Sequence, residues 1–246
     1  MILVLEIAYD GAPFLGWRKN NQGPSIEAAL EKALTQILQE PVLINAASRT
    51  DRGVHALGQV VGVTTSNPPK NLQSFVIGLN SQLPPEIRCL SVKTAPDSFH
   101  PTLDAKAKEY RYSISLGPVQ IPLLRHTHWH VHYDLDFSLL TQAKDLFIGT
   151  HDFRGLCNWR KGLKEDDTIR TVFDISLEQS ENALFFTFKG DRFLYKMVRN
   201  IVGTCIWIAR GKISLSSAQE ALKTRKRSHA GTTAPAHGLT LISVSY

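Results

Sequence analysis

One acidic side chain, Asp51, is flanked by Arg49 and Arg52 in the segment ASRTDRGVHA (47–56), and Gly53 follows as a residue that permits a turn. A carboxylate between two guanidinium groups is stabilised in its ionised form, and an exposed loop can present it to a ligand. An ionised carboxylate can act as a general base or as a nucleophile. The residue types alone favour a simpler interpretation, a surface turn whose charges are solvated.

Segments with regular hydrophobic periodicity surround this loop and must position it. The pattern predicts strands over residues 3–9, 42–46, 59–65, 87–94, 108–116, 168–177, 184–189 and 239–246. Helical spacing predicts helices over residues 26–37, 72–79, 139–147, 193–210 and 218–226, with Ser25 as the N-cap of the first. Strands interleaved with helices in two similar runs indicate an α+β protein of two related halves, 1–105 and 106–246. A site is expected where the two sheets meet.

The excess of positive charge is confined to the second half. Residues 106–246 hold 20 Lys and Arg against 13 Asp and Glu, whereas residues 1–105 hold 8 against 9. The whole chain has a net charge of +6, which favours a polyanionic partner. The cluster KTRKR (223–227) is a candidate for phosphate contact, as are Arg18-Lys19 and Arg160-Lys161. The alternative for the cluster is a solvated helix end.

The cysteines and the apolar stretches indicate the cellular compartment of the protein. Cys89, Cys157 and Cys205 lie far apart and in no CxxC pair, a pattern typical of a reduced, cytosolic chain with neither disulfides nor a thiolate zinc site. No basic region precedes the apolar N-terminal run, so no signal peptide is expected. The longest apolar stretch, Ile201–Ala209, is too short to span a bilayer. We therefore expect a soluble, cytoplasmic protein.

A longer segment around Asp51 resembles a known family. SRTDRGVHALGQV (48–60) is similar to GRTDxGVHAxGQV, the signature of the TruA family of tRNA pseudouridine synthases. Further similar segments follow in the family's order along nearly the whole chain. They are Tyr9-Asp10-Gly11 with Gly16-Trp17, Leu79-Asn80 with Leu83-Pro84, Phe99-His100, AKAKEYRY (105–112), His151-Asp152-Phe153, Arg170, FLYKMVRNIVG (193–203) and APAHGL (234–239).

The resemblance implies roles for four residues. Asp51 corresponds to the family's essential aspartate, and Arg199 to the arginine that pairs with it. Tyr110 corresponds to the ring that stacks on the target base, and Arg49 to an arginine that contacts the RNA. Without the resemblance, Tyr110 would be assigned to core packing, Arg199 to a snorkelling cation and Arg49 to a solvated loop charge.

The resemblance also implies the fold, the reaction and the partners. The pseudouridine synthase fold has mainly antiparallel sheets with flanking helices and a catalytic cleft between its halves. The family isomerises uridine to pseudouridine at positions 38, 39 and 40 of the tRNA anticodon stem-loop, and its members act as homodimers without a metal. The reaction breaks the N1–C1′ bond and rejoins the base through C5, so it requires no cofactor. A uridine inside a stem must first be flipped out.

Two other functions compete with this interpretation. A non-catalytic tRNA-binding or chaperone module would explain the basic half, but it would leave Asp51, Tyr110 and Arg199 without a use. A metal hydrolase would use the run of four histidines at alternate positions, because an HxH pair can ligate zinc. The run comprises His126, His128, His130 and His132.

Same-face residues on a strand are about 6.6 Å apart, so one strand cannot supply all four histidines to one ion. No cysteine or carboxylate has matching spacing. We therefore expect no metal, and a structural or RNA-facing role for the histidine run.

The chain departs from the family pattern near both of its most similar segments. Ser48 and Arg52 stand where glycine and alanine are most common around the aspartate, and His237 replaces the usual glutamate before Gly238. None of these changes removes the catalytic carboxylate. They bear instead on the contacts with RNA and on which uridines are accepted.

Overall fold

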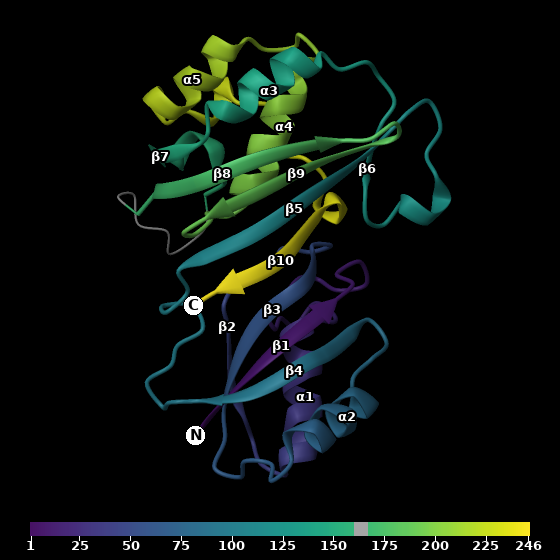
Figure 1. Ribbon diagram of the computed structural model, residues 1–246, viewed down its shortest axis with the longest axis vertical. Coiled ribbons are helices and arrows are strands. Elements are labelled where there is room, and N and C mark those ends of the chain that lie inside the picture. The colour runs from purple at the N-terminus through teal and green to yellow at the C-terminus, as the bar shows by residue number, and fades with distance from the viewer. Residues whose placement is uncertain (160–166) are drawn as a thin grey trace. The chain divides into compact units, whose positions relative to one another are not determined.

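The chain divides into two units (Figure 1). Met1–Lys106 and Thr240–Tyr246 form the first unit, and Ala107–Leu239 form the second. The structure is a computed structural model that describes residues 1–159 and 167–246. The chain leaves the first unit one residue after the end expected for the first half. The C-terminal strand differs from the expectation, because it lies in the first unit and not with the second half.

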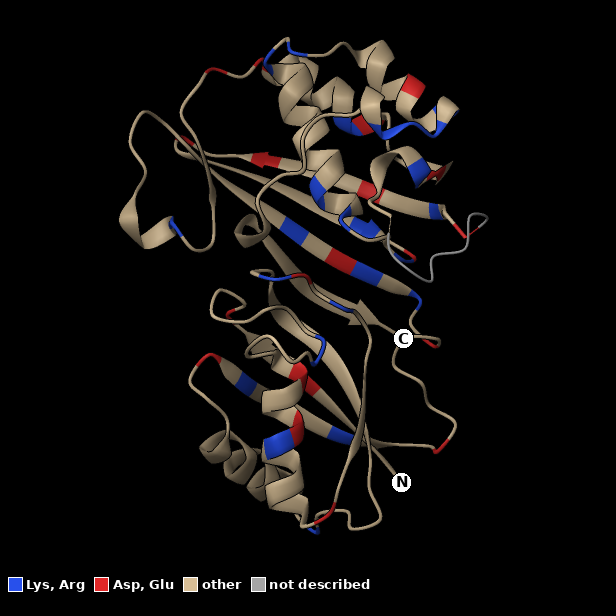
Figure 2. Cartoon of the chain, turned by 180° about the vertical axis from the view of Figure 1, so that it is seen from behind, with Lys and Arg blue, Asp and Glu red and all other residues tan. Residues whose placement is uncertain are grey.

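Positive charge gathers in the second unit. Its sequence holds 19 Lys and Arg against 13 Asp and Glu, whereas the first unit holds nine of each. Figure 2 shows Lys and Arg along the strands and helices of the second unit. The electrostatic attraction for a polyanion therefore belongs mainly to this unit.

Three antiparallel pairings build the sheet of the first unit. β1 (Ile2–Tyr9) lies between β3 (His55–Thr64) and β4 (Ile87–Ala95) and runs antiparallel to both. β2 (Leu43–Ala46) pairs antiparallel with the second half of β3. The loop that carries Asp51 connects β2 to β3, so both of its ends are fixed in the same sheet.

The C-terminal strand completes this sheet. β10 (Leu239–Ser245) runs parallel to β3, with Thr240 opposite His55. The backbones approach closely here, because a Cβ atom at Gly58 would stand 2.4 Å from the carbonyl oxygen of Ile242. Residues from the end of the sequence are thereby placed beside the strand that follows the Asp51 loop.

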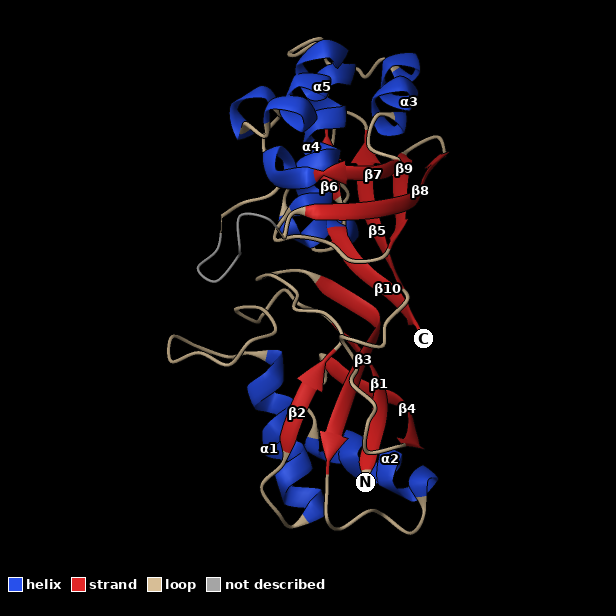
Figure 3. Ribbon diagram, turned by 90° about the vertical axis from the view of Figure 1, so that its left-hand side faces the viewer, coloured by secondary structure: helices blue, strands red, loops and turns tan. Residues whose placement is uncertain are grey.

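Helices α1 (Ile26–Leu38) and α2 (Leu72–Gln82) lie on one face of the first sheet (Figure 3). α1 begins where predicted, because the Ser25 hydroxyl accepts a hydrogen bond from the backbone N–H of Ala28 at 3.3 Å. The inward face of α1 is fully buried at Ile26, Leu30 and Leu34. Burial of this apolar stripe against the strands forms the core of the first unit.

The sheet of the second unit is also mainly antiparallel. β5 (Ala107–Leu116) pairs with β9 (Ala183–Gly190), β9 pairs with β8 (Ile169–Gln179), and β8 pairs with β7 (Gly149–Asp152). A short strand, β6 (Trp129–Val131), runs parallel to β5. β5 differs from the half-buried strand that the alternation predicts, because both of its faces are buried over Tyr112–Ser115.

Helices α3 (Phe137–Asp145), α4 (Met197–Ala209) and α5 (Leu215–Thr224) cover one face of this second sheet (Figure 3). α4 is buried along almost its whole length. The prediction of a helix from residue 193 is wrong at its start, because Lys196 adopts a left-handed conformation with φ +61° that ends any continuous helix there. Residues 193–195 instead form an irregular segment.

The predicted α+β class, with mainly antiparallel sheets and flanking helices, is confirmed. In the described part of the chain, no helix combines the length and the apolar character needed to cross a membrane.

Candidate active site

Asp51 occupies a tight turn in the β2–β3 loop. The backbone N–H of Val54 donates to the carbonyl oxygen of Asp51 at 3.1 Å, and Gly53 adopts φ +78°, which favours glycine. The Asp51 side chain is half-buried, whereas Arg49 and Arg52 are exposed on either side. The turn therefore presents the carboxylate between two solvent-facing cations.

The residue before Asp51 is anchored by the first strand and by the loop that follows it. The hydroxyls of Thr50 and Tyr9 are 2.8 Å apart, and the N–H of Trp17 donates to the Thr50 carbonyl at 3.0 Å. Trp17 is 2% exposed, and a Cβ atom at Gly16 would stand 2.9 Å from the same carbonyl oxygen. These contacts leave the backbone at Asp51 little freedom.

A buried amide fastens the other end of the loop. Gln59, which is fully buried on β3, donates from Nε2 to the Ser48 carbonyl at 2.6 Å and accepts from the Ser48 N–H at 3.1 Å. The same Nε2 lies 3.3 Å from the Tyr9 hydroxyl. Tyr9 and Gln59 belong to segments that resemble the family, but the sequence alone assigned them no role. The only sequence feature that could have indicated this is the alternation of side chains along β1 and β3. It places Tyr9 and Gln59 on the same face of the sheet, next to the Asp51 loop.

Tyr110 lies on β5 in the second unit and is 6% exposed. It faces Phe188 across the strand pair. The ring of Phe193 meets it edge-on, with centroids 5.3 Å apart and planes at 84°. The irregular segment before α4 is what brings Phe193 to this position. Burial and the edge-on contact with Phe193 therefore fix the plane of the Tyr110 ring.

Arg199 lies in the first turn of α4, on the same unit as Tyr110. Its Nε donates to the carbonyl oxygen of Ala234 at 2.8 Å. Arg199 also acts electrostatically on Tyr112, whose hydroxyl donates to the Pro235 carbonyl at 2.7 Å. Burial raises the pKa of Tyr112 well above its usual value, and the guanidinium of Arg199 lowers it by a smaller amount, so this phenol stays protonated at neutral pH.

Within the second unit, the structure thus places Arg199 close to β5, the strand that carries Tyr110 and Tyr112. Asp51 belongs to the first unit, and its convergence with Tyr110 and Arg199 stays a prediction.

A buried cation that no sequence pattern singled out lies two residues before Tyr110. Lys108 is 7% exposed, and burial, with a further contribution from Arg192 and Arg170, lowers its pKa to about 8. Arg170 is 6% exposed, and its Nη1 lies 3.0 Å from a carboxylate oxygen of Asp167. The available signal was again strand alternation, which puts Lys108 on the same face as Tyr110.

The basic cluster at 223–227 is divided between structural and exposed positions. Arg225 Nε lies 2.9 Å from a carboxylate oxygen of Asp152. Arg227 is half-buried and donates inward to Asn200. Lys223 and Lys226 are exposed. Arg225 is also exposed, so the prediction of phosphate contact stays a prediction for these three residues, and the Arg160-Lys161 pair lies outside the described residues.

The histidine run does not share one strand face. Only His130 lies inside β6, and its Nε2 is 2.8 Å from the carbonyl oxygen of Gly117. The carbonyl of His128 is 3.1 Å from Nε2 of His237. Burial lowers the pKa of the His128 ring, and His237 lowers it further. Among the described residues, no group of three or more His, Cys, Asp or Glu side chains could hold a metal ion.

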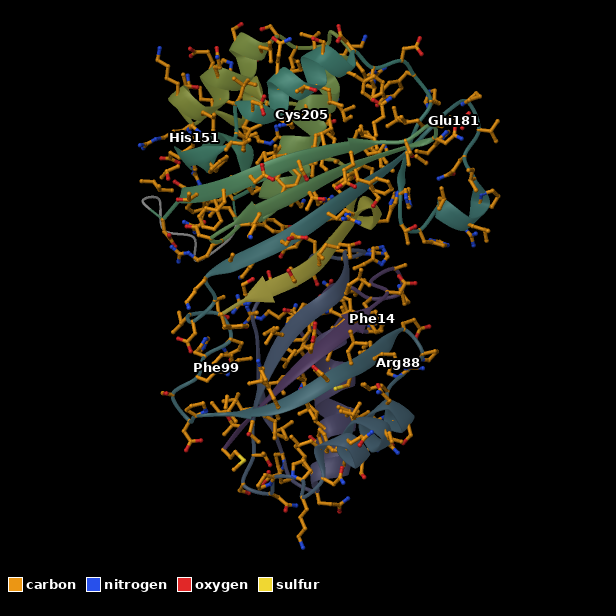
Figure 4. The ribbon with its side chains drawn as sticks, in the orientation of Figure 1. Phe14, Arg88, Phe99, His151, Glu181 and Cys205 are labelled. Atoms are coloured by element: carbon orange, nitrogen blue, oxygen red, sulfur yellow. The ribbon has the colours of Figure 1, made fainter. Side chains whose placement is uncertain are left out.

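The three cysteines are buried and free. Figure 4 labels Cys205 among the side chains around α4. Burial raises the pKa of all three thiols, that of Cys89 to about 11. Because the thiolate is the reactive form, none of them offers a nucleophile at neutral pH.

Comparison with known proteins agrees with the signature around Asp51. A family model described as tRNA pseudouridine synthase matches residues 7–104 and 143–246. These ranges include Asp51 and Arg199, whereas Tyr110 lies between them. A protein named tRNA pseudouridine synthase A 2 from Protochlamydia amoebophila is 47% identical, over 98% of this chain and 93% of its own length.

Two further relatives, both named tRNA pseudouridine synthase A, are similar over the same extent. The one from Acetivibrio thermocellus is 40% identical and is covered over 98% of both chains. The one from Brevibacillus brevis is 38% identical, over 98% of this chain and 97% of its own. The similarity therefore spans both units.

Proposed function

The chain belongs to the family of tRNA pseudouridine synthases, and we propose that it acts on uridines 38, 39 and 40 of the anticodon stem-loop with Asp51 as its catalytic carboxylate. The activity of the family makes the protein an isomerase that converts uridine to pseudouridine in tRNA. The observation that most supports Asp51 is the anchoring of its loop. The backbone on both sides of the carboxylate is held by hydrogen bonds that involve Thr50, Tyr9, Trp17 and Gln59.

In this proposal the carboxylate of Asp51 acts on the target nucleotide. The N1–C1′ bond breaks, the detached base turns, and C5 bonds to C1′. C5 then loses its proton and N1, no longer bonded to the sugar, gains one, so the product is an isomer of uridine. Asp51 either adds covalently to the nucleotide or takes a proton from the sugar, and an ionised carboxylate serves both routes. No oxidant, reductant or imported group enters this balance, so the chemistry requires no cofactor.

Three side chains support the carboxylate in this proposal. Arg199 pairs with Asp51 and keeps it ionised and oriented. Tyr110 stacks on the flipped base, an interaction worth about 1–3 kcal/mol. Arg49, exposed in the same loop as Asp51, contacts the RNA backbone. A non-catalytic tRNA-binding module, the alternative function, is not supported, because it gives no use to an anchored carboxylate.

We also propose that the protein acts as a cytoplasmic homodimer. Exposed apolar side chains in the loop before β6 support self-association, because Val119 is 76% and Leu123 is 89% exposed. Sedimentation equilibrium of the parent and of a Val119→Ser, Leu123→Ser variant tests the dimer. A parent that sediments as a monomer at micromolar concentration would exclude it.

Asp51→Asn tests the central proposal, because asparagine keeps the size of the side chain but removes its charge, basicity and nucleophilicity. We expect no detectable tritium release from C5-labelled tRNA, with tRNA affinity within about tenfold of the parent, or 1.4 kcal/mol. Asp97→Asn, at a carboxylate whose side chain is 84% exposed, is the matched control. Tritium release at a near-parental rate from Asp51→Asn would assign the chemistry to another residue.

Two additional assays complete the test. A chelator arm asks whether activity depends on a metal, and we expect the parental rate to persist. Transcripts that carry uridine at only one of positions 38, 39 and 40 test the target assignment. Full activity on a transcript that lacks uridine at all three would contradict it.

A further inference from the structure

The segment 231–235, which precedes β10, lies backbone to backbone against α4. A Cβ atom at Gly203 would stand 1.8 Å from the carbonyl oxygen of Thr232, so only glycine fits at that position. The N–H of Gly231 donates to the Thr204 hydroxyl at 3.0 Å, and that hydroxyl donates to the Asn200 carbonyl at 2.6 Å. We call residues 231–235 the clamp segment, because it is held along successive turns of one helix.

The clamp segment holds Arg199 at two points. Ala234 accepts from Nε of Arg199 at 2.8 Å, and its N–H donates to the Arg199 carbonyl at 3.1 Å. A guanidinium is planar, so a bond at Nε fixes the plane in which the other N–H groups lie. With Nε bonded to a backbone carbonyl, a bidentate carboxylate has to be met by the two Nη groups. The position of Ala234 therefore sets where Arg199 can present its charge.

Asn200, the next residue of α4, connects the clamp segment to the rest of the second unit. Its side chain is fully buried. The amide Nδ2 donates to the Leu156 carbonyl at 3.0 Å and to Oδ1 of Asn158 at 3.0 Å. Its Oδ1 accepts from the hydroxyl of Thr233 at 2.6 Å and from Nη2 of Arg227 at 3.1 Å. All four hydrogen-bonding positions of this amide are thus used.

We propose that Thr233 and Arg227 are positioning residues, which act through Asn200 to hold Ala234 and thereby fix the guanidinium of Arg199. This inference rests on the proposed function, in which Arg199 holds the catalytic carboxylate. It gives the segment APAHGL (234–239) a use that the chemistry alone did not supply. It also assigns Arg227 a role inside the protein, in place of the predicted contact with phosphate.

The pair Thr233→Val and Thr233→Ser tests the proposal, because valine removes the hydroxyl with little change of shape, whereas serine restores it. For Thr233→Val we expect kcat on tRNA to fall roughly five- to tenfold, the effect of removing one buried hydrogen bond. KM for tRNA should stay within about twofold. Thr233→Ser should recover most of kcat. Thr232→Val, the same change at the exposed neighbouring residue, is the control.

The pH profile separates a positioning role from a general loss of stability. For Thr233→Val the acid limb of kcat/KM should move to higher pH, because a carboxylate whose cation is less well held takes up its proton more readily. Loss of folded protein would lower the whole profile without moving the limb. Arg227→Met removes the other hydrogen bond to Oδ1 of Asn200, and we expect the same shift of the acid limb. The proposal therefore remains testable if Thr233→Val does not fold.

Arg199→Met distinguishes failure of this inference from failure of the proposed function. If Arg199→Met leaves the acid limb in place, Arg199 does not hold the carboxylate and the proposed function is wrong on that point. If Arg199→Met moves the limb but Thr233→Val and Arg227→Met leave both kcat and the limb at parental values, the positioning role is wrong. A reduced salt dependence of tRNA binding in Arg227→Met would also overturn it, because that result assigns Arg227 to phosphate.

Discussion

The hydroxyl groups of Tyr9 and Thr50 lie 2.8 Å apart, so a side chain of the first strand is hydrogen-bonded to the residue immediately before Asp51. The Tyr9 ring is 4% exposed and Thr50 is 7% exposed, so water cannot readily replace the bond if it is broken. The base of the Asp51 loop is therefore part of the core of the first unit, whereas the Asp51 side chain is only half-buried.

Tyr9→Phe should loosen this loop and slow catalysis. It leaves Thr50 without one of its partners, and we expect a loss of about 1–2 kcal/mol in the free energy of unfolding. kcat should fall up to about tenfold, with tRNA affinity unchanged. Tyr246→Phe is the control, because it removes a bond of 2.8 Å to the Pro101 carbonyl in the same unit but away from the loop. Equal effects of the two changes on kcat would contradict a specific role for Tyr9.

Tyr110 should contribute mainly through its ring. Tyr110→Phe keeps the stacking surface, so we expect KM for tRNA to stay within about twofold, and any fall in kcat measures the contribution of the hydroxyl. Tyr110→Ala removes the surface and should lower kcat/KM by roughly 5- to 150-fold, which corresponds to about 1–3 kcal/mol of stacking. Steady-state tritium release measures both variants. A kcat/KM for Tyr110→Ala equal to that of the parent would exclude the stacking role.

Lys108 should make stability depend on alkaline pH. Its pKa is about 8 in the folded protein against about 10.4 in the unfolded chain, so between these values the unfolded chain binds more protons. The contribution of Lys108 to stability is therefore least favourable below pH 8 and improves as pH rises toward 10.4. Lys108→Met removes this dependence.

The stability gained by Lys108→Met relative to the parent should accordingly be largest near pH 7 and shrink by at most about 3 kcal/mol at pH 10.4. Urea unfolding of parent and variant at matched pH values measures the difference. The comparison also cancels the thiols, whose raised pKa values act in the opposite direction in both proteins. A constant difference across this window would mean that Lys108 titrates near its ordinary value.

The two exposed lysines of the basic cluster should act on affinity and leave the chemistry unchanged. Neutralising Lys223 and Lys226 to glutamine should weaken tRNA binding and reduce the slope of log K against log salt by about 0.7–0.9 for each phosphate that is no longer neutralised. kcat at saturating tRNA should stay at the parental value. Filter binding at several salt concentrations gives the slopes. Identical slopes in parent and double variant would make the cluster an ordinary solvated helix end.

Local signals predicted much of the fold. The Ser25 cap, the apolar stripe of α1 and the strand β5 depend on neighbours in the sequence, and each appears where expected. The strands β6 and β7 were not predicted, because β7 reads Gly-Thr-His-Asp, without an apolar residue, and β6 is only the three residues Trp-His-Val. The start of α4 was misplaced because nothing in the identity of Lys196 forecasts a left-handed backbone.

Long-range relationships in the candidate site could not be predicted from the sequence. The family signature pointed to Asp51, but the bonds of Tyr9 and Gln59 to its loop depend on strand register. The side chain of Arg227 points into the second unit because it donates to the buried Oδ1 of Asn200, a residue that is distant in sequence. A run of basic residues cannot by itself distinguish a cation that is used inside the protein from one that faces solvent.

Because β10 pairs with β3, the sheet of the first unit is completed only after the second unit has been synthesised. Residues 1–106 leave the ribosome before the second unit, yet the edge of β3 next to the Asp51 loop stays open until residues 240–246 arrive. All of residues 107–239 are synthesised in the interval, and an uncovered strand edge is a template for wrong pairing. The unit that carries Asp51 is thus begun before its companion and completed after it, when the companion has already had time to fold.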